Sequence, residues 1–332
     1  MDLGLLKNII SIIKGDNSDI NGTTGKWYKF VIVILVFGGF LSTLLSIVQE
    51  PLVCEFPNEF NEKAGVAHCL IHGTTKVADE FKDFCTVNSN ENEAPKINYL
   101  LKLPKACLLC ALIMLIAVKS YEFCRTGGLD ELKNKDGYVK EFYDQTFTYK
   151  KIFRNYFLAL CLYWIVNFGI FASFDAIIHE SYLTFGYQVI AYYLFGANQA
   201  DPICQSFPLT GSCEIRYFDV SGAVQENTSL CTMNVNLVNS TFYLALWFYL
   251  WILIFLSPVT FCVWLILGFR PKYRAGYLGL TLKPHEIVEL DFICQKYTIC
   301  QYFILYHTLT YFKLKDTREI IHSLYRYECG QA

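Results

Sequence analysis

Residues 240–269 read STFYLALWFYLWILIFLSPVTFCVWLILGF and contain no charged side chain. A transmembrane helix needs about 20 mostly apolar residues, because it rises about 1.5 Å per residue through a hydrocarbon core about 30 Å thick. This run is longer than a membrane requires and would reach about 45 Å as a single helix. We therefore expect it to tilt, to kink at Pro258, or to project beyond the bilayer.

Three further apolar runs lie before it in the chain. Residues 30–48 and 155–174 contain no charged side chain, and each is long enough to cross a bilayer. Residues 97–118 form a weaker candidate, which spans the bilayer only if Lys102 and Lys105 extend their side chains to the membrane surface. A buried core helix could explain one such run. Four of them predict an all-α membrane protein, built as a bundle of four transmembrane helices.

The composition narrows the function. Charged residues make up 17% of the chain and the formal net charge is -2, which argues against a nucleic-acid partner. The sequence has no Walker loop, no His-Glu-x-x-His zinc motif and no nucleophile elbow. We therefore expect neither enzymatic activity nor a cofactor, and membrane lipid is the partner that the apolar runs imply.

The distribution of Lys and Arg predicts the orientation, because loops that stay on the cytoplasmic side are enriched in these residues. There are four in residues 1–29, eight in 119–154 and nine in 270–332, compared with six in 49–105 and one in 175–239. We therefore expect a multi-pass membrane protein with both termini and the 119–154 loop in the cytoplasm. The loops at 49–96 and 175–239 would then be extracellular.

The two segments outside the membrane at the chain ends both have helical character. Residues 1–13 place Leu6, Ile9, Ile10 and Ile13 at helical spacing, which predicts a helix followed by a linker up to residue 29. The tail at 270–332 alternates apolar and charged residues, as helices of a cytoplasmic cap would.

Six of the fourteen cysteines lie in the two loops that we expect to be extracellular. Cys54, Cys69 and Cys85 belong to the first loop, and Cys204, Cys213 and Cys231 belong to the second. Disulfides form in an oxidising space and stiffen loops that have no large core of their own. Six cysteines allow fifteen connectivities, and the sequence alone does not choose among them.

Short segments along nearly the whole chain carry a family resemblance. They are Asp16-Asn17, Trp27-Tyr28-Lys29, Glu50-Pro51-Leu52-Val53-Cys54, His68-Cys69-Leu70-Ile71-His72-Gly73-Thr74, Phe185-Gly186-Tyr187-Gln188-Val189, Asp201-Pro202, Phe207-Pro208, Ser221-Gly222, Leu230-Cys231, Trp247-Phe248 and Gln301-Tyr302-Phe303-Ile304-Leu305-Tyr306. Together they resemble the innexins. The Cys-Cys-Gly motif of tetraspanins and the Trp–Gly-Leu-Trp pattern of claudins are absent, and the loop cysteines are spaced more widely than in connexins.

The chain departs from the family pattern at the second span. The innexin signature there is Tyr-Tyr-Gln-Trp-Val-Pro, whereas this sequence has Tyr99-Leu100-Leu101-Lys102-Leu103-Pro104 and keeps only the first Tyr and the Pro. This marks a diverged member, either a viral innexin (vinnexin) or a fast-evolving invertebrate copy. The third cysteines, Cys85 and Cys204, exceed the two per loop that are usual in the family, and they suggest an extra bridge.

The resemblance implies an octameric hemichannel in the plasma membrane that passes ions and small metabolites. Such a hemichannel can dock with a second one at a gap junction, or mix with other innexins. A four-span adhesion protein that does not conduct, and a regulatory subunit that joins other innexin channels, remain alternatives.

Four residues are candidates for the pore lining. The family resemblance places the 1–13 helix in the cytoplasmic mouth of the pore, with Asp2 and Leu6 in the lining, although the same helix could lie on the inner membrane surface. Glu50 and Glu55 follow the first span, and copies of them around a ring would form an acidic annulus that favours cations. A solvated loop face is the alternative for these two glutamates.

Pro104 and Pro258 are predicted to kink the second and fourth spans, because proline removes a backbone hydrogen bond. Asn167, within the third span, is expected to form an interhelical hydrogen bond. Asn227-Thr228-Ser229 is a glycosylation motif in the second outer loop, and a bulky glycan there would hinder end-to-end docking.

Overall fold

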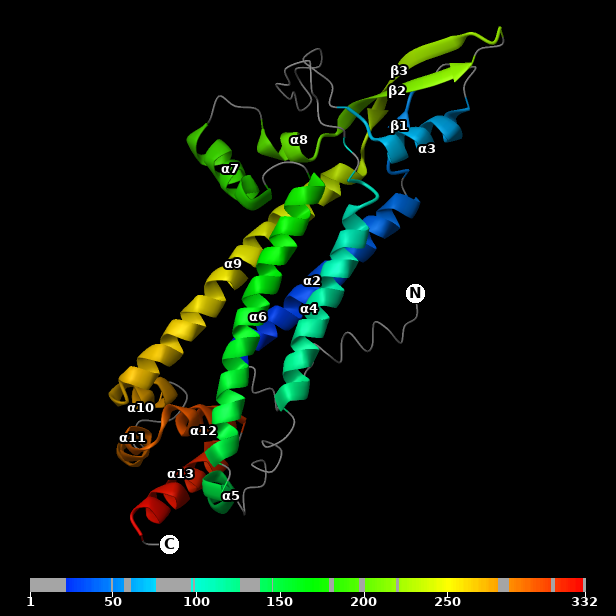
Figure 1. Cartoon of the computed structure of the whole chain (residues 1–332). Helices are drawn as coiled ribbons and strands as arrows, with labels where there is room; N and C mark the ends of the chain where they lie inside the picture. Colours follow the sequence, from blue (N-terminus) through cyan, green and yellow to red (C-terminus); the bar gives the residue numbers. More distant parts are fainter. Residues whose placement is uncertain are drawn as a thin grey trace. The chain divides into compact units, whose positions relative to one another are not determined.

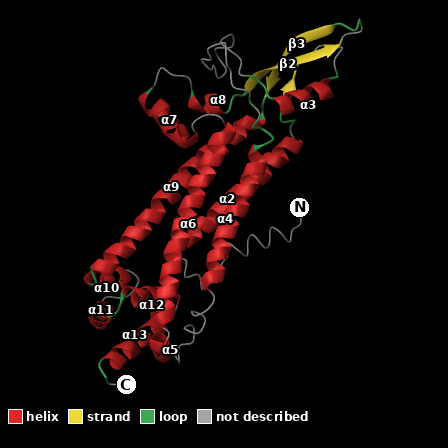
Figure 2. Cartoon of the chain, viewed as in Figure 1, coloured by secondary structure: helices red, strands yellow, loops and turns green. Residues whose placement is uncertain are grey.

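The computed structural model describes residues 22–48, 50–56, 61–75, 97, 99–125, 138–144, 146–178, 182–196, 201–218, 221–279, 287–311 and 314–330. Helices dominate this part of the chain (Figure 2). The chain divides into two compact units. The loop unit contains the described residues of Val31–Ile113 and Asn167–Ile252, and the tail unit contains those of Met1–Phe30, Met114–Val166 and Leu253–Ala332.

Among the described residues, four helices are long and apolar enough to cross a membrane (Figure 1). They are α2 (Gly22–Val48), α4 (Leu103–Arg125), α6 (Thr146–Ile178) and α9 (Val235–Phe269). Their candidate spans are Lys26–Val48, Leu103–Ser120, Thr148–Ile178 and Val235–Phe269. The predicted fold class, a helical membrane protein with four spans, is confirmed. The boundary between the two units falls within each of these helices.

The second long helix begins later than the sequence suggested. α4 starts at Leu103, whereas Ile97, the predicted start, forms an isolated β-bridge. The backbone N–H of Leu103 donates to the carbonyl of Tyr99 over 2.9 Å, which closes a turn ahead of the helix. Pro104 therefore lies in the first turn, where its missing N–H removes no intrahelical bond. This corrects the prediction that Pro104 kinks the helix, because here the proline begins it.

The loop unit contains a small antiparallel sheet that the sequence analysis did not predict. Its strands are β1 (Val53–Cys54), β2 (Thr210–Phe218) and β3 (Val224–Thr232), in the order β1-β3-β2. β2 and β3 pair along their whole lengths, from Thr210 opposite Thr232 to Phe218 opposite Val224. β3 thus joins strands from both loops, since β1 lies between α2 and α4 while β2 and β3 lie between α6 and α9.

Three shorter helices of the loop unit lie in the same two loops: α3 (Glu62–His72), α7 (Tyr182–Phe195) and α8 (Pro202–Ser206). α3 lies beside the sheet and contacts β1 and β2 (Figure 1). Asn61 caps its N-terminus by accepting from the N–H of Ala64, and Gly73, at φ 86°, ends it. Only glycine adopts a positive φ readily, so the chain can turn there directly toward β2.

Aromatic side chains form the core of the loop unit. The rings of Tyr182, Phe207 and Tyr243 are all buried, and Phe207 stacks on Tyr243 with their centroids 5.7 Å apart. The hydroxyl of Tyr182 donates to the carbonyl of Tyr243 over 2.8 Å, which ties α7 to α9. This hydrogen bond gives the buried phenol a partner, as a polar group in an apolar interior requires.

The tail unit contains five shorter helices: α5 (Tyr138–Asp144), α10 (Lys272–Gly279), α11 (Ile287–Lys296), α12 (Ile299–Tyr311) and α13 (Leu314–Glu328). α12 forms its centre, since Tyr302, Phe303 and Leu305 are fully buried. Trp264, near the end of α9, packs against Phe303 with ring centroids 4.9 Å apart. The helical loop and helical tail are as predicted. The predicted 1–13 helix lies outside the described residues.

Candidate functional site

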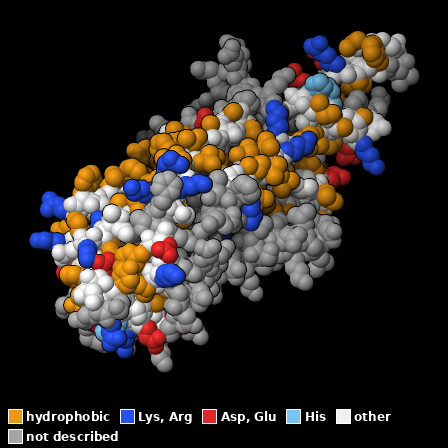
Figure 3. Space-filling view, turned by 60° about the horizontal axis from the view of Figure 1, so that its bottom comes forward, with side chains coloured by type: hydrophobic (Ala, Val, Ile, Leu, Met, Phe, Trp, Pro, Cys, Tyr) orange, Lys and Arg blue, Asp and Glu red, His pale blue; other side chains and the backbone are white. Residues whose placement is uncertain are grey.

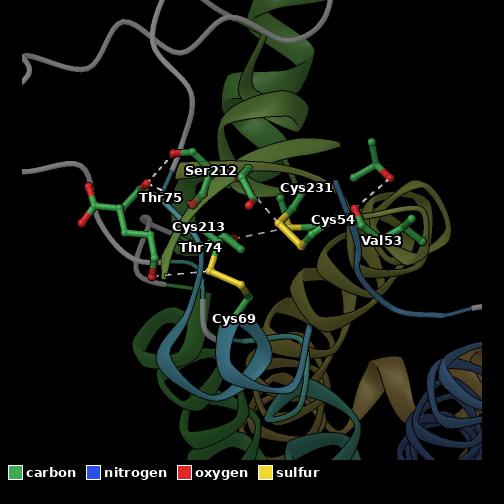
Figure 4. The surroundings of a disulfide bond; sticks show 12 residues. Val53, Cys54, Cys69, Thr74, Thr75, Ser212, Cys213 and Cys231 are labelled. Atoms are coloured by element: carbon green, nitrogen blue, oxygen red, sulfur yellow. Dashed lines mark hydrogen bonds between the residues drawn. A yellow bond between two sulfur atoms is a disulfide. The ribbon is translucent and has the colours of Figure 1, made fainter. Parts of the chain in front are cut away.

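Two disulfides join the loop after α2 to the loop after α6 (Figure 4). Cys54 lies opposite Cys231 in the β1–β3 pairing, and their sulfurs are bonded. The second disulfide links Cys69 on α3 to Cys213 on β2. The Sγ atoms of Cys54, Cys69 and Cys231 lie within 4.8 Å of one another, so the two bridges adjoin. Of the connectivities that the sequence left open, the structure selects these cross-loop pairs.

The other cysteines outside the membrane spans differ between the loops and the tail. Cys204, on α8, is also disulfide-bonded, whereas Cys85 lies outside the described residues. In the tail unit, Cys294, Cys300 and Cys329 are free thiols. Burial raises the pKa of the Cys294 thiol to about 12, so it stays protonated at neutral pH.

The two predicted acidic pore residues that the structure describes lie in one short segment. Glu50 follows the end of α2, Glu55 follows β1, and both side chains are exposed. The backbone N–H of Glu55 donates to the carbonyl of Leu230 over 3.0 Å, so this segment is fastened to β3. The other two predicted pore residues, Asp2 and Leu6, lie outside the described residues.

The predicted glycosylation residue Asn227 lies on β3, opposite Ile215 of β2. Its side chain is partly exposed. Beyond it, the hairpin end is exposed and partly apolar, with Phe218 and Val224 at 74% and 58% exposure. Any group attached to Asn227 would therefore lie beside an apolar hairpin end.

Proline inside α9 leaves one carbonyl without its usual donor, and another helix supplies one. α9 continues through Pro258, which has no N–H for the carbonyl of Ile254 four residues earlier. The indole N–H of Trp164, on α6, donates to that carbonyl over 3.2 Å. One residue before Ile254, the carbonyl of Leu253 accepts from the Tyr28 hydroxyl of α2 over 3.0 Å. Two other long helices are thus hydrogen-bonded to α9 just before its proline.

Asn167 forms the interhelical hydrogen bond that its position in the third span predicted. Its side chain is fully buried, and Nδ2 donates to the carbonyl of Leu250 on α9 over 3.0 Å. The amide therefore acts in helix packing.

Comparison with known proteins identifies the family. The family model described as Innexin matches residues 26–327, which include all four candidate spans and both disulfides. This chain belongs to the innexin family.

Individual innexins match shorter parts of the chain, at 25% to 28% identity. It is 28% identical to innexin inx2 of Drosophila melanogaster over 133 residues, which are 40% of this chain and 36% of that protein. It is 26% identical to innexin shaking-B of the same fly over 126 residues, which are 38% and 34% of the two chains. Innexin inx2 of Schistocerca americana is 25% identical over 152 residues, 46% of this chain and 42% of the relative. The matched segments thus span less than half of each relative.

A buried arginine of this innexin, missed by the sequence analysis, joins the end of α9 to the tail helices. Arg274 is only 3% exposed. Its Nε donates to the carbonyl of Leu267 over 2.7 Å, and Nη1 donates to those of Cys294 and Tyr297 over 3.1 and 2.6 Å. Helix C-termini carry partial negative charge and carbonyls without helical donors, so one guanidinium caps both α9 and α11. An Arg soon after an apolar span is the only sequence signal for this role.

A tyrosine cluster holds α5 of this innexin against its tail helices. The hydroxyl of Tyr143, on α5, lies 2.7 Å from that of Tyr297 and donates to a carboxylate oxygen of Glu328 on α13. Lys296 forms an ion pair with the same carboxylate. Burial, and after it the hydrogen bond to Glu328, raise the pKa of Tyr143. The phenol is therefore a neutral donor at physiological pH.

Proposed function

We propose that this innexin is a subunit of a large-pore oligomeric channel, a gap junction or hemichannel that passes ions and small metabolites. The observation that carries the proposal is the family match over residues 26–327, since it covers every candidate span together with the loops between them. The relatives found in the comparison are innexins as well.

The surfaces of the four spans support an oligomer. In an apolar stretch of 18 residues within each span, only 33% to 39% is buried within the chain. Large apolar side chains stay exposed on them, as on α4 at Leu108, Leu109, Leu112 and Ile113, and Figure 3 shows a broad field of hydrophobic side chains on one face. A ring of subunits would cover part of this surface and enclose a pore, and lipid would cover the rest. The family resemblance suggests eight subunits.

Cysteine chemistry supports the proposed orientation. The disulfides join the loop between α2 and α4 to the loop between α6 and α9, whereas the three described tail cysteines are free. Disulfides persist in oxidising spaces and thiols in the cytosol. Together with the excess of Lys and Arg on the other side, this supports the proposal that both loops lie outside the cell and both termini inside. Asp2, Leu6, Glu50 and Glu55 are the proposed pore-lining residues.

Junctional conductance between paired oocytes that express only this chain tests the proposal, together with dye uptake into single cells. Junctional current is expected for a gap junction, and dye uptake without junctional current for an undocked hemichannel. If both signals are absent although surface expression is verified, the result would contradict the proposed channel. It would instead favour an adhesion protein or a regulatory subunit, and co-expression with another innexin would separate those two.

A further inference from the structure

The helix α7 carries a row of apolar side chains that the chain itself leaves exposed. The row consists of Leu183, Tyr187, Ile190 and Leu194, and each of these side chains is at least 37% exposed. Residues spaced by four, three and four positions lie on one side of an α-helix, because successive residues are turned by about 100°. The four side chains therefore form a continuous row along α7, which we call the α7 stripe.

The other two sides of α7 have different surroundings. Thr184 and Gln188 form an exposed polar side, where Nε2 of Gln188 donates to Oγ1 of Thr184 over 3.2 Å. The third side packs on the protein through the four buried residues Tyr182, Phe185, Gly186 and Val189. A helix at the boundary between a protein, lipid and water needs three such sides, one for each of its surroundings.

The composition of α7 also fits a membrane surface better than bulk water. Its sequence, YLTFGYQVIAYYLF, contains no charged residue, although the helix belongs to a loop outside the spans. Four of these residues are tyrosines. Tyrosine is enriched at membrane surfaces, because its ring is apolar while its hydroxyl reaches the headgroups.

A hydrogen bond to α9 sets the level of α7 relative to the membrane. The indole N–H of Trp247 donates to the carbonyl of Leu183, in the first turn of α7, over 3.1 Å. The helical residues from Trp247 to Phe269 rise by about 33 Å, which is enough to cross a hydrocarbon core about 30 Å thick. Arg270 comes directly after Phe269 and marks one surface of the bilayer. Trp247, and with it the start of α7, therefore lies near the opposite surface.

At this level α7 also turns away from the direction of the spans. α6 ends at Ile178 and α7 begins soon after it, at Tyr182. In Figure 1, α7 runs across the direction of the first part of α9, which belongs to the same unit, instead of along it. A helix that turns in this way at a membrane surface lies along that surface, with its apolar side toward the lipid.

We propose that the α7 stripe binds phospholipids at the membrane surface, in the region where the acyl chains meet the glycerol backbone. Phospholipid is favoured over a second copy of the chain because the four side chains carry one polar atom, the Tyr187 hydroxyl, whereas protein interfaces have polar rims. Since α7 is uncharged, the binding does not require anionic headgroups. The proposal goes beyond channel function, and only the choice of leaflet rests on the proposed orientation.

Photocrosslinking of the full-length chain in phosphatidylcholine vesicles tests the proposal. Tyr187 and Leu194 are replaced, one at a time, by p-benzoylphenylalanine, which bonds to nearby C–H groups on irradiation. We expect phosphatidylcholine adducts at both positions, identified by mass spectrometry of the α7 peptide. An anionic phospholipid or added salt should leave the yield unchanged. Because both leaflets contain the same lipid, the result does not depend on the proposed orientation.

Two further positions serve as controls for the same photoreactive residue. Gln188 lies on the polar side of α7, and Phe218 is an exposed aromatic residue of the same unit, at the hairpin end. Lipid adducts should be lost at both. All four replaced side chains are exposed, so the core is unchanged, and equal melting temperatures would verify this.

Three results would overturn the proposal. The first is an adduct between two copies of the chain at Tyr187 and Leu194 without a lipid adduct, which would assign the α7 stripe to a subunit interface. The second is the absence of both adducts, which would place the stripe in water. The third is a lipid yield at Gln188 or Phe218 equal to that at Tyr187, which would show that the stripe is not the side that binds lipid.

Discussion

The indole N–H of Trp164 donates a hydrogen bond of 3.2 Å to the carbonyl of Ile254. Ile254 lies four residues before Pro258, the one residue of that helical turn without an N–H. Inside a bilayer no water can satisfy such a carbonyl, so the protein must provide the donor. The third long helix thereby makes the proline of the fourth tolerable.

Replacing Trp164 should therefore destabilise the protein in a way that depends on Pro258. Trp164→Phe keeps an aromatic ring but removes the donor, and we expect a loss of about 1–3 kcal/mol in the free energy of unfolding. In a Pro258→Ala background the backbone N–H returns, so the same substitution should cost clearly less. Unfolding of the four proteins of this double-mutant cycle in detergent gives the coupling energy, expected at about 1 kcal/mol or more.

Tyr28→Phe is the matched control for this cycle. It removes the hydroxyl that donates to Leu253, but residue 257, four positions later, is a serine with its own N–H. The same hydroxyl lies 2.7 Å from the buried Oγ of Ser257, so its loss has a cost of its own, but that cost should be largely independent of Pro258. Additive effects of Trp164→Phe and Pro258→Ala would contradict the proposed compensation.

Gly186 is required by close packing between α7 and α9. A Cβ at this position would lie 2.2 Å from Cε3 of Trp247, whose indole is held by a 3.1 Å hydrogen bond to the carbonyl of Leu183. Gly186→Ala should destabilise the protein by about 1–3 kcal/mol. Gly169→Ala, where no atom lies within 4 Å, should be neutral or stabilise by up to about 1 kcal/mol. Thermal unfolding of both variants measures the difference, and equal melting temperatures would refute it.

Arg274 should not be replaceable by lysine. A lysine keeps the charge but lacks the fork of donors that reaches Leu267, Cys294 and Tyr297. Arg274→Lys leaves buried carbonyls without a partner, which costs about 1–3 kcal/mol. We expect faster proteolysis of the tail, measured by limited trypsin digestion and mass spectrometry. The exposed Arg270→Lys is the control, and a tail equally resistant in both variants would argue against the cap.

The proposed acidic annulus predicts a change in ion selectivity. Glu50→Gln and Glu55→Gln each remove one negative charge per subunit, and so a full ring of charges from an oligomer. The cation-to-anion permeability ratio, measured from reversal potentials in salt gradients, should fall in both variants. Glu62→Gln should leave the ratio unchanged. An unchanged ratio in the double variant Glu50→Gln/Glu55→Gln would assign these glutamates to a solvated loop face.

A glycan on Asn227 would lie beside the exposed hairpin end and would hinder docking of two hemichannels. Asn227→Gln should lower the apparent mass of the protein from cells and increase junctional conductance relative to dye uptake. Ser229→Ala, which destroys the same motif without changing Asn227, should have the same effect. If mass and coupling are unchanged in both variants, the glycan hypothesis fails.

Local composition was enough to find the membrane helices and the helical tail. An apolar run long enough to span a bilayer needs no knowledge of its neighbours, and Phe30–Val48 and Ser240–Phe269 both lie within helices of the structure. The start of the second helix was misplaced because Ile97 and Leu100 are as apolar as the helix that follows. Pairing of Ile97 with Thr74 removes that segment from the helix, and the hydropathy of the sequence cannot indicate such a contact.

The sequence by itself thus determined that this protein has four spans, loops rich in cysteine and the motifs of an innexin. Only the tertiary structure decided which cysteines pair, because Cys54 and Cys231 are separated by 177 residues, and Cys69 and Cys213 by 144. The same is true of the sheet and of Arg274 between two helix ends. Hydropathy depends on residues that are neighbours in the chain, whereas each of these arrangements depends on the register in which distant segments meet.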